Sequence, residues 1–254
     1  MLPIFASGAA PALMRYRSAL AILYNCYYYF SPMDFALLRR ELVRFRHRVD
    51  RPAYIGQRFH SYLNGTILDV GCDQAVLKGI LGPDRYTGIG LTEEASVKAD
   101  LERTDHLPFR DAEWNTVICL DTLEHLNNFH AMCDELFRVA GEYVIISLPN
   151  CWVQARRSIA RGAGSIWQYG LAPEAPQDRH NWFFNTEEAY NFFVSLTHKQ
   201  GLDAEIVELV ALENRRPLIN RIWRRIKYPS RRKYLNLYPH TVVCVYHITR
   251  KRAN

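Results

Sequence analysis

The sequence lacks any Cys-x-x-Cys pair, although it contains six cysteines among 254 residues. Pairs at that spacing are typical of structural zinc sites and dithiol redox sites, so this distribution indicates neither a metal site nor a disulfide framework. Most of the six lie in apolar runs, which favours buried, reduced thiols in the cytosol. They are Cys26, Cys72, Cys119, Cys133, Cys151 and Cys244.

The sequence also lacks a long hydrophobic run and a basic leader. Its longest uncharged early stretch, residues 18–33, is interrupted by Asn25 and several tyrosines, and it is shorter than the ~20 apolar residues that span a bilayer. Residues 1–12 lack the basic start of a secretory signal. We therefore expect a cytoplasmic protein, either free or peripheral to the inner face of the membrane. The net charge of +6 is modest, so the position of the charge matters more than its total.

The stretch from Thr66 to Ala75 is the most informative part of the chain. A short apolar run ends in Asp69, a turn follows at Gly71, and a helical pattern covers residues 75–81. A buried strand that leads through a tight turn into a helix leaves free backbone N–H groups at the carboxyl end of the strand, where ligands bind in many α/β proteins. The plain alternative is an ordinary strand, turn and helix with a capping acid.

From residue 67 onward, predicted strands alternate with helices, which predicts a parallel sheet with both faces covered. The predicted strands cover residues 67–70, 86–91, 96–100, 114–120, 143–148, 202–212 and 240–249, and the last two form an antiparallel pair. Helices are predicted over residues 124–139 and 186–199. Polar or turn groups stand at the carboxyl ends of the parallel strands, and this convergence predicts a binding site. These groups are Asp69–Gly71, Gly90–Glu94, Asp100–Leu101, Asp121–Thr122 and Pro149–Asn150.

We predict a single α/β domain over residues 64–254, preceded by a helical extension over residues 1–63. Helical stretches are expected around residues 27–29 and over residues 35–51, where the arginines would form a solvated helix face. The domain contains two predicted insertions. Residues 151–182 form a long connection rich in glycine and proline, and residues 213–239 contain nine basic residues between Arg215 and Lys233 without an acid.

Within this basic insertion, apolar residues at helical spacing predict an amphipathic helix. The apolar positions are Leu218, Ile219, Ile222, Trp223 and Ile226. Such a helix binds anionic lipid headgroups or nucleic-acid phosphates, or else packs its apolar side on the domain and leaves its arginines in water. The residues alone leave these alternatives open.

The run from Leu68 to Asn150 resembles the class I S-adenosylmethionine-dependent methyltransferases, in particular the type 11 group. The resemblance rests on the order and spacing of Leu-Asp-Val-Gly-Cys (68–72), Ala-Asp-Leu-Glu (99–102), Leu-Pro-Phe (107–109), Cys-Leu-Asp-Thr-Leu-Glu-His-Leu (119–126) and Ile-Ser-Leu-Pro-Asn (146–150). It implies a Rossmann-like fold with seven mostly parallel strands, an antiparallel last strand, helices on both faces, and S-adenosylmethionine as the cofactor.

The resemblance also implies roles for individual residues. The first turn, with Asp69, Gly71, Cys72 and Asp73, would lie against the methionine part of the cofactor. Asp100 and the backbone of Leu101 would contact the adenine, and Leu120 and Asp121 would lie near the methionine ammonium group. His125 would stand close to the transferred methyl group, and we add His180 as a second candidate base because imidazole titrates near neutral pH.

The sequence departs from the family pattern at three places. Asp73 and Ala75 stand where the family has its second and third turn glycines, and Gly90 replaces the acid that holds the ribose hydroxyls, a role that Glu93 or Glu94 could take over. The link between the second and third strands is too short for the usual helix. The first hypothesis is therefore a methyltransferase acting on a small or membrane-proximal acceptor, such as a sugar or lipid-linked glycan. The alternatives are a non-catalytic binding or scaffold domain and, ranked lower, an RNA methyltransferase.

Overall fold

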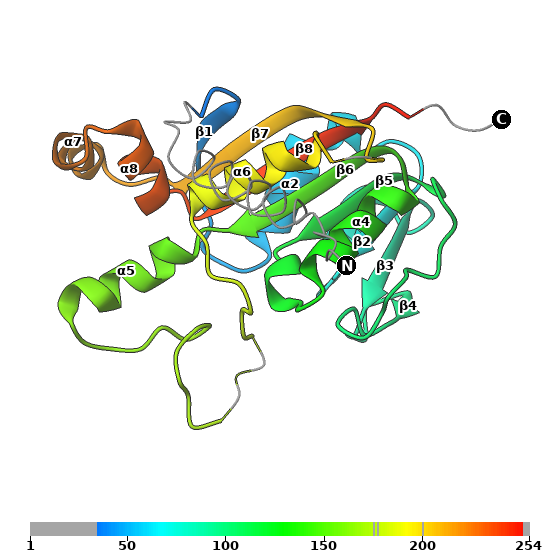
Figure 1. The fold of residues 1–254 in the computed structure, drawn as a ribbon, viewed down its shortest axis with the longest axis horizontal. Coiled ribbons are helices and arrows are strands. Elements are labelled where there is room, and N and C mark those ends of the chain that lie inside the picture. The colour runs from blue at the N-terminus through cyan, green and yellow to red at the C-terminus, as the bar shows by residue number, and fades with distance from the viewer. Residues whose placement is uncertain (1–34, 175, 177, 200, 251–254) are drawn as a thin grey trace, which may run out of the picture. The chain divides into compact units, whose positions relative to one another are not determined.

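The computed structural model describes residues 35–174, 176, 178–199 and 201–250 (Figure 1). The chain divides into two units, residues 1–36 and residues 37–254, and the fold described here belongs to the second unit. The expected helix around residues 27–29, the uncharged run 18–33 and Cys26 lie outside the described residues. Within the described part, no helix is long and apolar enough to cross a bilayer.

An eight-stranded sheet forms the centre of the second unit, in the order β1-β7-β8-β6-β5-β2-β3-β4. The strands are β1 (Leu38–Val43), β2 (Ile67–Val70), β3 (Tyr86–Gly90), β4 (Val97–Lys98), β5 (Trp114–Leu120), β6 (Ala140–Pro149), β7 (Ala204–Asn214) and β8 (Thr241–Ile248). All paired strands are parallel except that β8 runs antiparallel to both β6 and β7. The predicted Rossmann-like α/β sheet is confirmed, with β1 as an additional edge strand.

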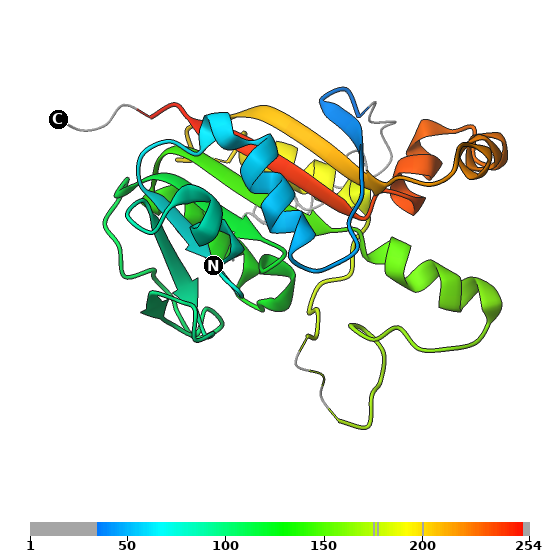
Figure 2. The same cartoon turned by 180° about the vertical axis from the view of Figure 1, so that it is seen from behind.

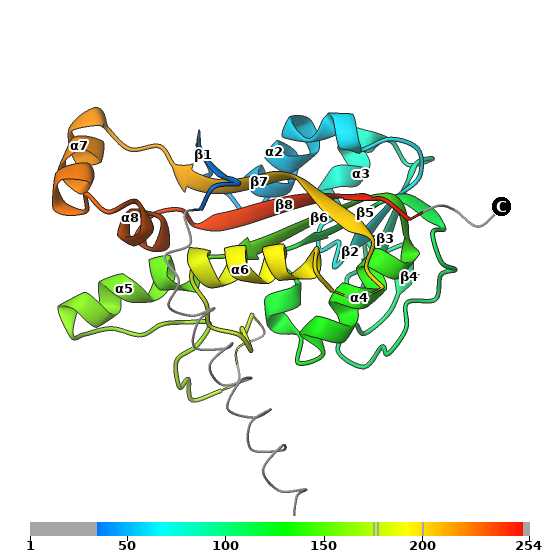
Figure 3. The same ribbon diagram turned by 45° about the horizontal axis from the view of Figure 1, so that its top comes forward.

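Helices cover both faces of this sheet, as Figure 3 shows: α2 and α3 lie on one face, and α4 and α6 on the other. Figure 2 shows α2 crossing the face that is turned away in Figure 1. The helices are α2 (Asp50–Arg58), α3 (Val76–Leu81), α4 (Phe129–Val139), α5 (Cys151–Arg161), α6 (Thr186–Leu196), α7 (Leu218–Lys227) and α8 (Arg231–Leu237), with single 3-10 turns η1 (His60–Tyr62) and η2 (Leu123–His125).

The central strands are apolar on both sides because helices cover both of their faces. All four residues of β2 are buried, and Ile67, Ile118 and Ile145 from three adjacent strands are fully inaccessible to solvent. Helix α6 begins with a capping box. The Asn185 side chain accepts hydrogen bonds from backbone N–H groups of the first turn, and the Glu188 side chain accepts one from the Asn185 backbone N–H. The described cysteines are all free and buried, as predicted.

The prediction of a helix over residues 35–51 is wrong. Residues 38–43 form β1, which pairs with β7, and the helix begins only at Asp50. The Asp50 carboxylate accepts hydrogen bonds from the N–H groups of Arg46 and His47, at 2.6 and 2.9 Å, and this closes the turn between strand and helix. Pairing with a distant strand overrides a local helical pattern.

The long connection predicted over residues 151–182 begins with helix α5 instead of a loop. The Asn150 side chain accepts from the Trp152 N–H at the start, and Gly162 ends the helix with a φ of 62°. Both signals were present in the sequence as an N-cap residue and a C-terminal glycine. Residues 91–96, all of which the structure describes, contain no helix, as the short link between β3 and β4 predicted.

A candidate active site at the carboxyl ends of the strands

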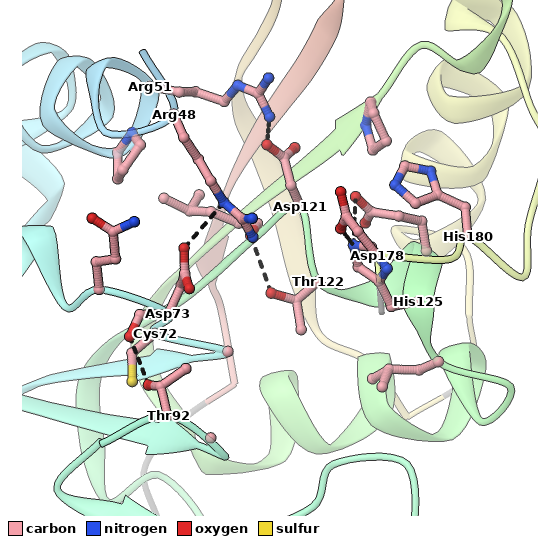
Figure 4. A pocket seen from close by; sticks show the side chains of 18 of the residues that line it. Arg48, Arg51, Cys72, Asp73, Thr92, Asp121, Thr122, His125, Asp178 and His180 are labelled. Carbon is pink, nitrogen blue, oxygen red and sulfur yellow. Dashed lines mark hydrogen bonds and ion pairs between the residues drawn. The ribbon is translucent and has the colours of Figure 1, made fainter. Parts of the chain in front are cut away.

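A cavity of about 870 Å³ lies at the carboxyl ends of β2, β3, β5 and β6. All of the residues predicted to contact the cofactor or to act as a base, apart from the substitutes Glu93 and Glu94, line it; Figure 4 labels Cys72, Asp73, Asp121, His125 and His180 among them. These residues are Asp69, Gly71, Cys72, Asp73, Gly90, Asp100, Leu101, Leu120, Asp121, His125 and His180. Parallel strands bring their carboxyl ends to one edge of a sheet, which explains why residues from Asp69 to His125 meet there, whereas His180 comes from the connection between α5 and α6.

The first turn keeps a glycine-type backbone although two of its residues carry side chains. Gly71 has a φ of 81°, and a Cβ atom there would lie 2.2 Å from the Thr122 hydroxyl oxygen, so only glycine fits. Asp73 and Ala75 have φ values of 43° and 48°, in the left-handed region that glycine adopts without steric cost. Asp73 and Ala75, which stand in place of two glycines of the family, therefore add side chains to the turn but keep the backbone conformation that glycine favours.

Asp69 is buried at the end of β2, and among the described residues its carboxylate has one hydrogen-bond partner, the Tyr86 hydroxyl, which donates to Oδ2 at 2.7 Å. Burial raises the pKa of Asp69 to about 6, and the bond from Tyr86 partly opposes this. Burial also raises the pKa of the neighbouring Cys72 thiol, and the charge of Asp69 adds to the effect. Asp69 is thus held in a poorly solvated position at the cavity wall.

Asp121 is held from two sides. Its backbone φ is 47°, and the Ser147 hydroxyl donates to its Oδ1 at 2.8 Å. Arg51 from α2 forms an ion pair with its other oxygen, and Figure 4 shows the guanidinium pointing at the carboxylate. The buried Arg51 Nε has no hydrogen-bond partner among the described residues. A second arginine, Arg48, pairs with Asp73 at 3.1 Å.

The sequence analysis missed Arg48 and Arg51 as cavity residues and assigned the arginines of residues 35–51 to a solvated helix face. No local signal distinguishes them from solvated arginines, because their partners Asp73 and Asp121 lie much later in the sequence, after at least one helix and one strand. Arg51 and Asp121, for example, are brought together only when α2 packs beside the sheet.

At the other side of the cavity, the rings of His125 and His180 meet edge to face, with centroids 4.5 Å apart. His125 Nδ1 lies 2.8 Å from the Arg179 carbonyl oxygen, and His180 Nδ1 lies 2.6 Å from the Tyr169 hydroxyl. Burial and the neighbouring His125 lower the pKa of His180 to about 4, so this imidazole is neutral at pH 7.

Glu124 is a further cavity residue that the sequence analysis did not single out. Its side chain is 1% exposed, and burial raises its pKa to about 8 against the effect of Arg51. Its Oε2 is buried without a hydrogen-bond partner among the described residues. The adjacent His125 was recognised from its place in the motif, but Glu124 offered no separate signal.

The remaining predicted positions differ in how well they suit their roles. A Cβ atom on Gly90 would lie no closer than 3.7 Å to any neighbouring atom. Crowding at the Cβ position therefore does not explain why glycine stands where the family has an acid that holds the ribose. Glu93 and Glu94 do not line the cavity, and Glu93 is 97% exposed and pairs with Lys98. The suggestion that Glu93 or Glu94 holds the ribose hydroxyls in place of an acid at position 90 is therefore not supported.

Comparison with solved structures identifies the fold. The methyltransferase domain of the bacterial protein CtHen1-C aligns with a TM-score of 0.52 at 14% identity, over 79% of this chain and 97% of that one. A SAM-dependent methyltransferase from Archaeoglobus fulgidus aligns with a TM-score of 0.50 at 16% identity, over 80% and 96% of the two chains. The chain has the class I methyltransferase fold. No family model and no curated protein matches the sequence.

Proposed function

We propose that the protein is an S-adenosylmethionine-dependent methyltransferase. The observation that carries this proposal is the single cavity in which all of the residues implied by the methyltransferase resemblance meet, at the edge of the sheet where ligands of this fold class bind. The left-handed backbone at positions 73 and 75 supports it further, since the cofactor turn keeps its path without two of its glycines.

The residues present fit the cofactor. Its methionine part carries an ammonium and a carboxylate group, and the cavity supplies both complements. Asp69 and Asp121 would be acceptors for the ammonium, and Arg51, whose buried Nε has no partner in the described part of the chain, would be a donor for the carboxylate. Asp100 and the Leu101 backbone, which also line the cavity, would hold the adenine.

Methyl transfer from a sulfonium is an in-line displacement, so alignment of the two reactants supplies most of the acceleration. The bound cofactor would supply the activated methyl group. In this chain, Cys72, Asp73 and Leu120 shape the methionine end of the cavity, while His125 and His180 stand where an acceptor would lose a proton. His180 is neutral at pH 7, so its imidazole has a lone pair with which to accept a proton.

We further propose a membrane-proximal acceptor such as a lipid-linked glycan, because of the surface of α7. Its five apolar residues are 47% to 66% exposed, so they do not pack on the domain, whereas Arg224 on the inner side is anchored to Glu213 at 3.0 Å. Apolar residues flanked by Arg225 and Lys227, in a stretch that contains no acid from Arg215 to Lys233, are typical of a helix that lies on an anionic bilayer. The insertion follows the carboxyl end of β7, at the same edge of the sheet as the cavity.

The polar lining at the histidine side, with Gln154, Gln168 and Asp178, suits hydroxyl groups of a sugar. Trp182 is not among the residues that line the cavity, so it offers no stacking surface to a sugar there. Its Nε1 donates to the Leu126 carbonyl oxygen at 2.7 Å and its ring packs against Phe129.

Calorimetric titration with S-adenosylmethionine and S-adenosylhomocysteine tests the proposal. We expect micromolar binding of both, and at least a tenfold loss of affinity in Asp69→Ala but not in the exposed control Asp84→Ala. Absence of binding at millimolar cofactor would instead favour the non-catalytic scaffold. Unchanged affinity in Asp69→Ala would show that the cofactor site is assigned wrongly.

Co-sedimentation tests the membrane surface. The protein should bind vesicles that contain phosphatidylglycerol and not vesicles of phosphatidylcholine alone, and Trp223→Ala should weaken this binding severalfold. Trp167→Ala is the matched control, because Trp167 is equally exposed outside the basic insertion. Salt-sensitive binding to single-stranded RNA, without vesicle binding, would refute the membrane assignment and favour an RNA acceptor.

A further inference from the structure

The cavity contains a cluster of side chains that methyl transfer by itself does not require. Glu124, His125 and His180 each offer one ligand atom, and these atoms lie within 4.8 Å of one another. We infer that this cluster binds a divalent first-row transition-metal ion. The inference extends the proposed function, since the ion would occupy the same cavity, but ion binding can be measured without any methyl transfer.

Both imidazoles present the nitrogen that a metal needs. His125 Nδ1 donates to the Arg179 carbonyl oxygen, which leaves the Nε2 lone pair free. The Tyr169 hydroxyl donates to Cys151 Sγ at 2.6 Å, so it accepts from His180 Nδ1, and His180 Nε2 is free as well. Metal-binding histidines commonly have their second nitrogen held in this way.

Glu124 supplies the anionic ligand. Its carboxylate is 1% exposed, yet its Oε2 has no hydrogen-bond partner among the described residues. A buried carboxylate oxygen without a donor is costly, and a bound cation would satisfy it. The unpartnered oxygen is the observation that distinguishes this cluster from two packed histidines.

The charges around the cluster favour a cation. Asp178 Oδ1 lies 3.6 Å from His125 Nε2 and adds a second acid beside Glu124. Arg51 is the neighbouring cation, but its guanidinium is already paired with Asp121. The positive charge of Arg51 is therefore largely compensated by Asp121, and among the described residues neither Glu124 nor Asp178 forms an ion pair with a lysine or arginine.

Hydrogen bonds join the segment that contains His180 to the turn that contains Glu124 and His125, although these segments are more than fifty residues apart in the sequence. The Asn181 backbone N–H donates to the Glu124 carbonyl oxygen at 2.8 Å, and the Asn181 side chain donates to the His125 carbonyl oxygen at 2.6 Å. His180 is thereby held opposite η2. Ligand atoms at about 2.1 Å from an ion lie roughly 3.4 Å apart, so binding requires the widest pair to approach by up to about 1.4 Å, which side-chain rotation can supply.

Two imidazoles and one carboxylate suit zinc, manganese, iron or cobalt ions, whereas magnesium and calcium prefer oxygen ligands. Three protein ligands also leave positions open for water or for an acceptor hydroxyl. With an ion bound, both Nε2 lone pairs would be occupied. An acceptor hydroxyl held by the same site would then be more acidic, and its proton would pass to solvent water instead of to a histidine as its oxygen takes the methyl group.

Titration of the EDTA-treated full chain with Mn²⁺, followed by electron paramagnetic resonance, tests the inference. We expect one bound ion per chain and a loss of affinity of at least tenfold in Glu124→Gln and in His180→Asn. The matched controls Glu93→Gln and His60→Asn, at exposed positions outside the cavity, should keep the affinity of the original protein. Mg²⁺ at equal concentration should not displace Mn²⁺.

If the ligand variants fail to fold, nuclear magnetic resonance of the unaltered protein decides the matter, because bound Mn²⁺ should broaden the imidazole signals of His125 and His180 before those of His60. No binding at millimolar Mn²⁺, or equal affinity in the ligand variants, would overturn the inference. Cofactor titration in EDTA separates this result from the proposed function, since cofactor binding without metal binding would refute the metal site alone.

Discussion

Replacement of Asp69 by asparagine should make the protein more stable near neutral pH and weaken its cofactor binding. The Asp69 carboxylate is buried at the end of β2 and receives one hydrogen bond, from Tyr86. Asparagine has nearly the same shape, and its side-chain oxygen can accept the same bond. The substitution therefore removes a poorly solvated charge without a cavity and without depriving Tyr86 of its acceptor.

The magnitude follows from the pKa of Asp69, which burial raises from 3.8 to about 6. That difference corresponds to about 3 kcal/mol by which ionised Asp69 disfavours the folded state above pH 6. The folded protein binds the proton more tightly than the unfolded chain, so this penalty shrinks as the pH falls from 6 to 4. Asp69→Asn should therefore raise the free energy of unfolding by up to about 3 kcal/mol at pH 7.5 and by little at pH 4.

Urea unfolding of both proteins at pH 7.5 and pH 4.5 measures this difference, with Asp84→Asn as the exposed control. In the same samples, calorimetry should show at least tenfold weaker binding of S-adenosylmethionine, because the carboxylate no longer faces the ammonium group. A variant that is less stable at pH 7.5, or a stability difference that does not depend on pH, would refute the account of Asp69 as an incompletely solvated acid.

Two further substitutions test the backbone and the insertion. Gly71→Ala should lower the free energy of unfolding by about 2 kcal/mol or more, because Gly71 has a positive φ and lies close to Thr122. Gly90→Ala should change the free energy of unfolding by less than about 0.5 kcal/mol, because a Cβ there makes only ordinary contacts. Equal effects of the two substitutions in urea unfolding would contradict this reasoning. Glu213→Gln should cost about 3 kcal/mol, because it leaves Arg224 without its buried counter-ion, and it should make α7 more susceptible to limited proteolysis. An unchanged cleavage pattern would show that Glu213 does not anchor α7.

Strands β2 and β5 were predicted with their observed ends because their apolar runs are bounded by turn residues, and such runs depend little on the rest of the chain. The edge strand β1 was mistaken for a helix, since the apolar residues Leu38 and Leu42 stand at helical spacing, and the segment becomes a strand only by pairing with β7. The start of α5 was predicted as a loop because glycines and prolines later in the connection outweighed the Asn150 cap.

The sequence by itself determined the alternation of strands and helices, and with it the edge of the sheet at which Asp69, Asp121 and His125 gather. Hydrophobic periodicity and turn residues are local properties, and parallel strands necessarily collect their carboxyl ends. Only the tertiary structure decided which charges meet there. The Arg51–Asp121 pair and the approach of His180 to Glu124 join segments separated by many elements, and their positions depend on how those elements pack.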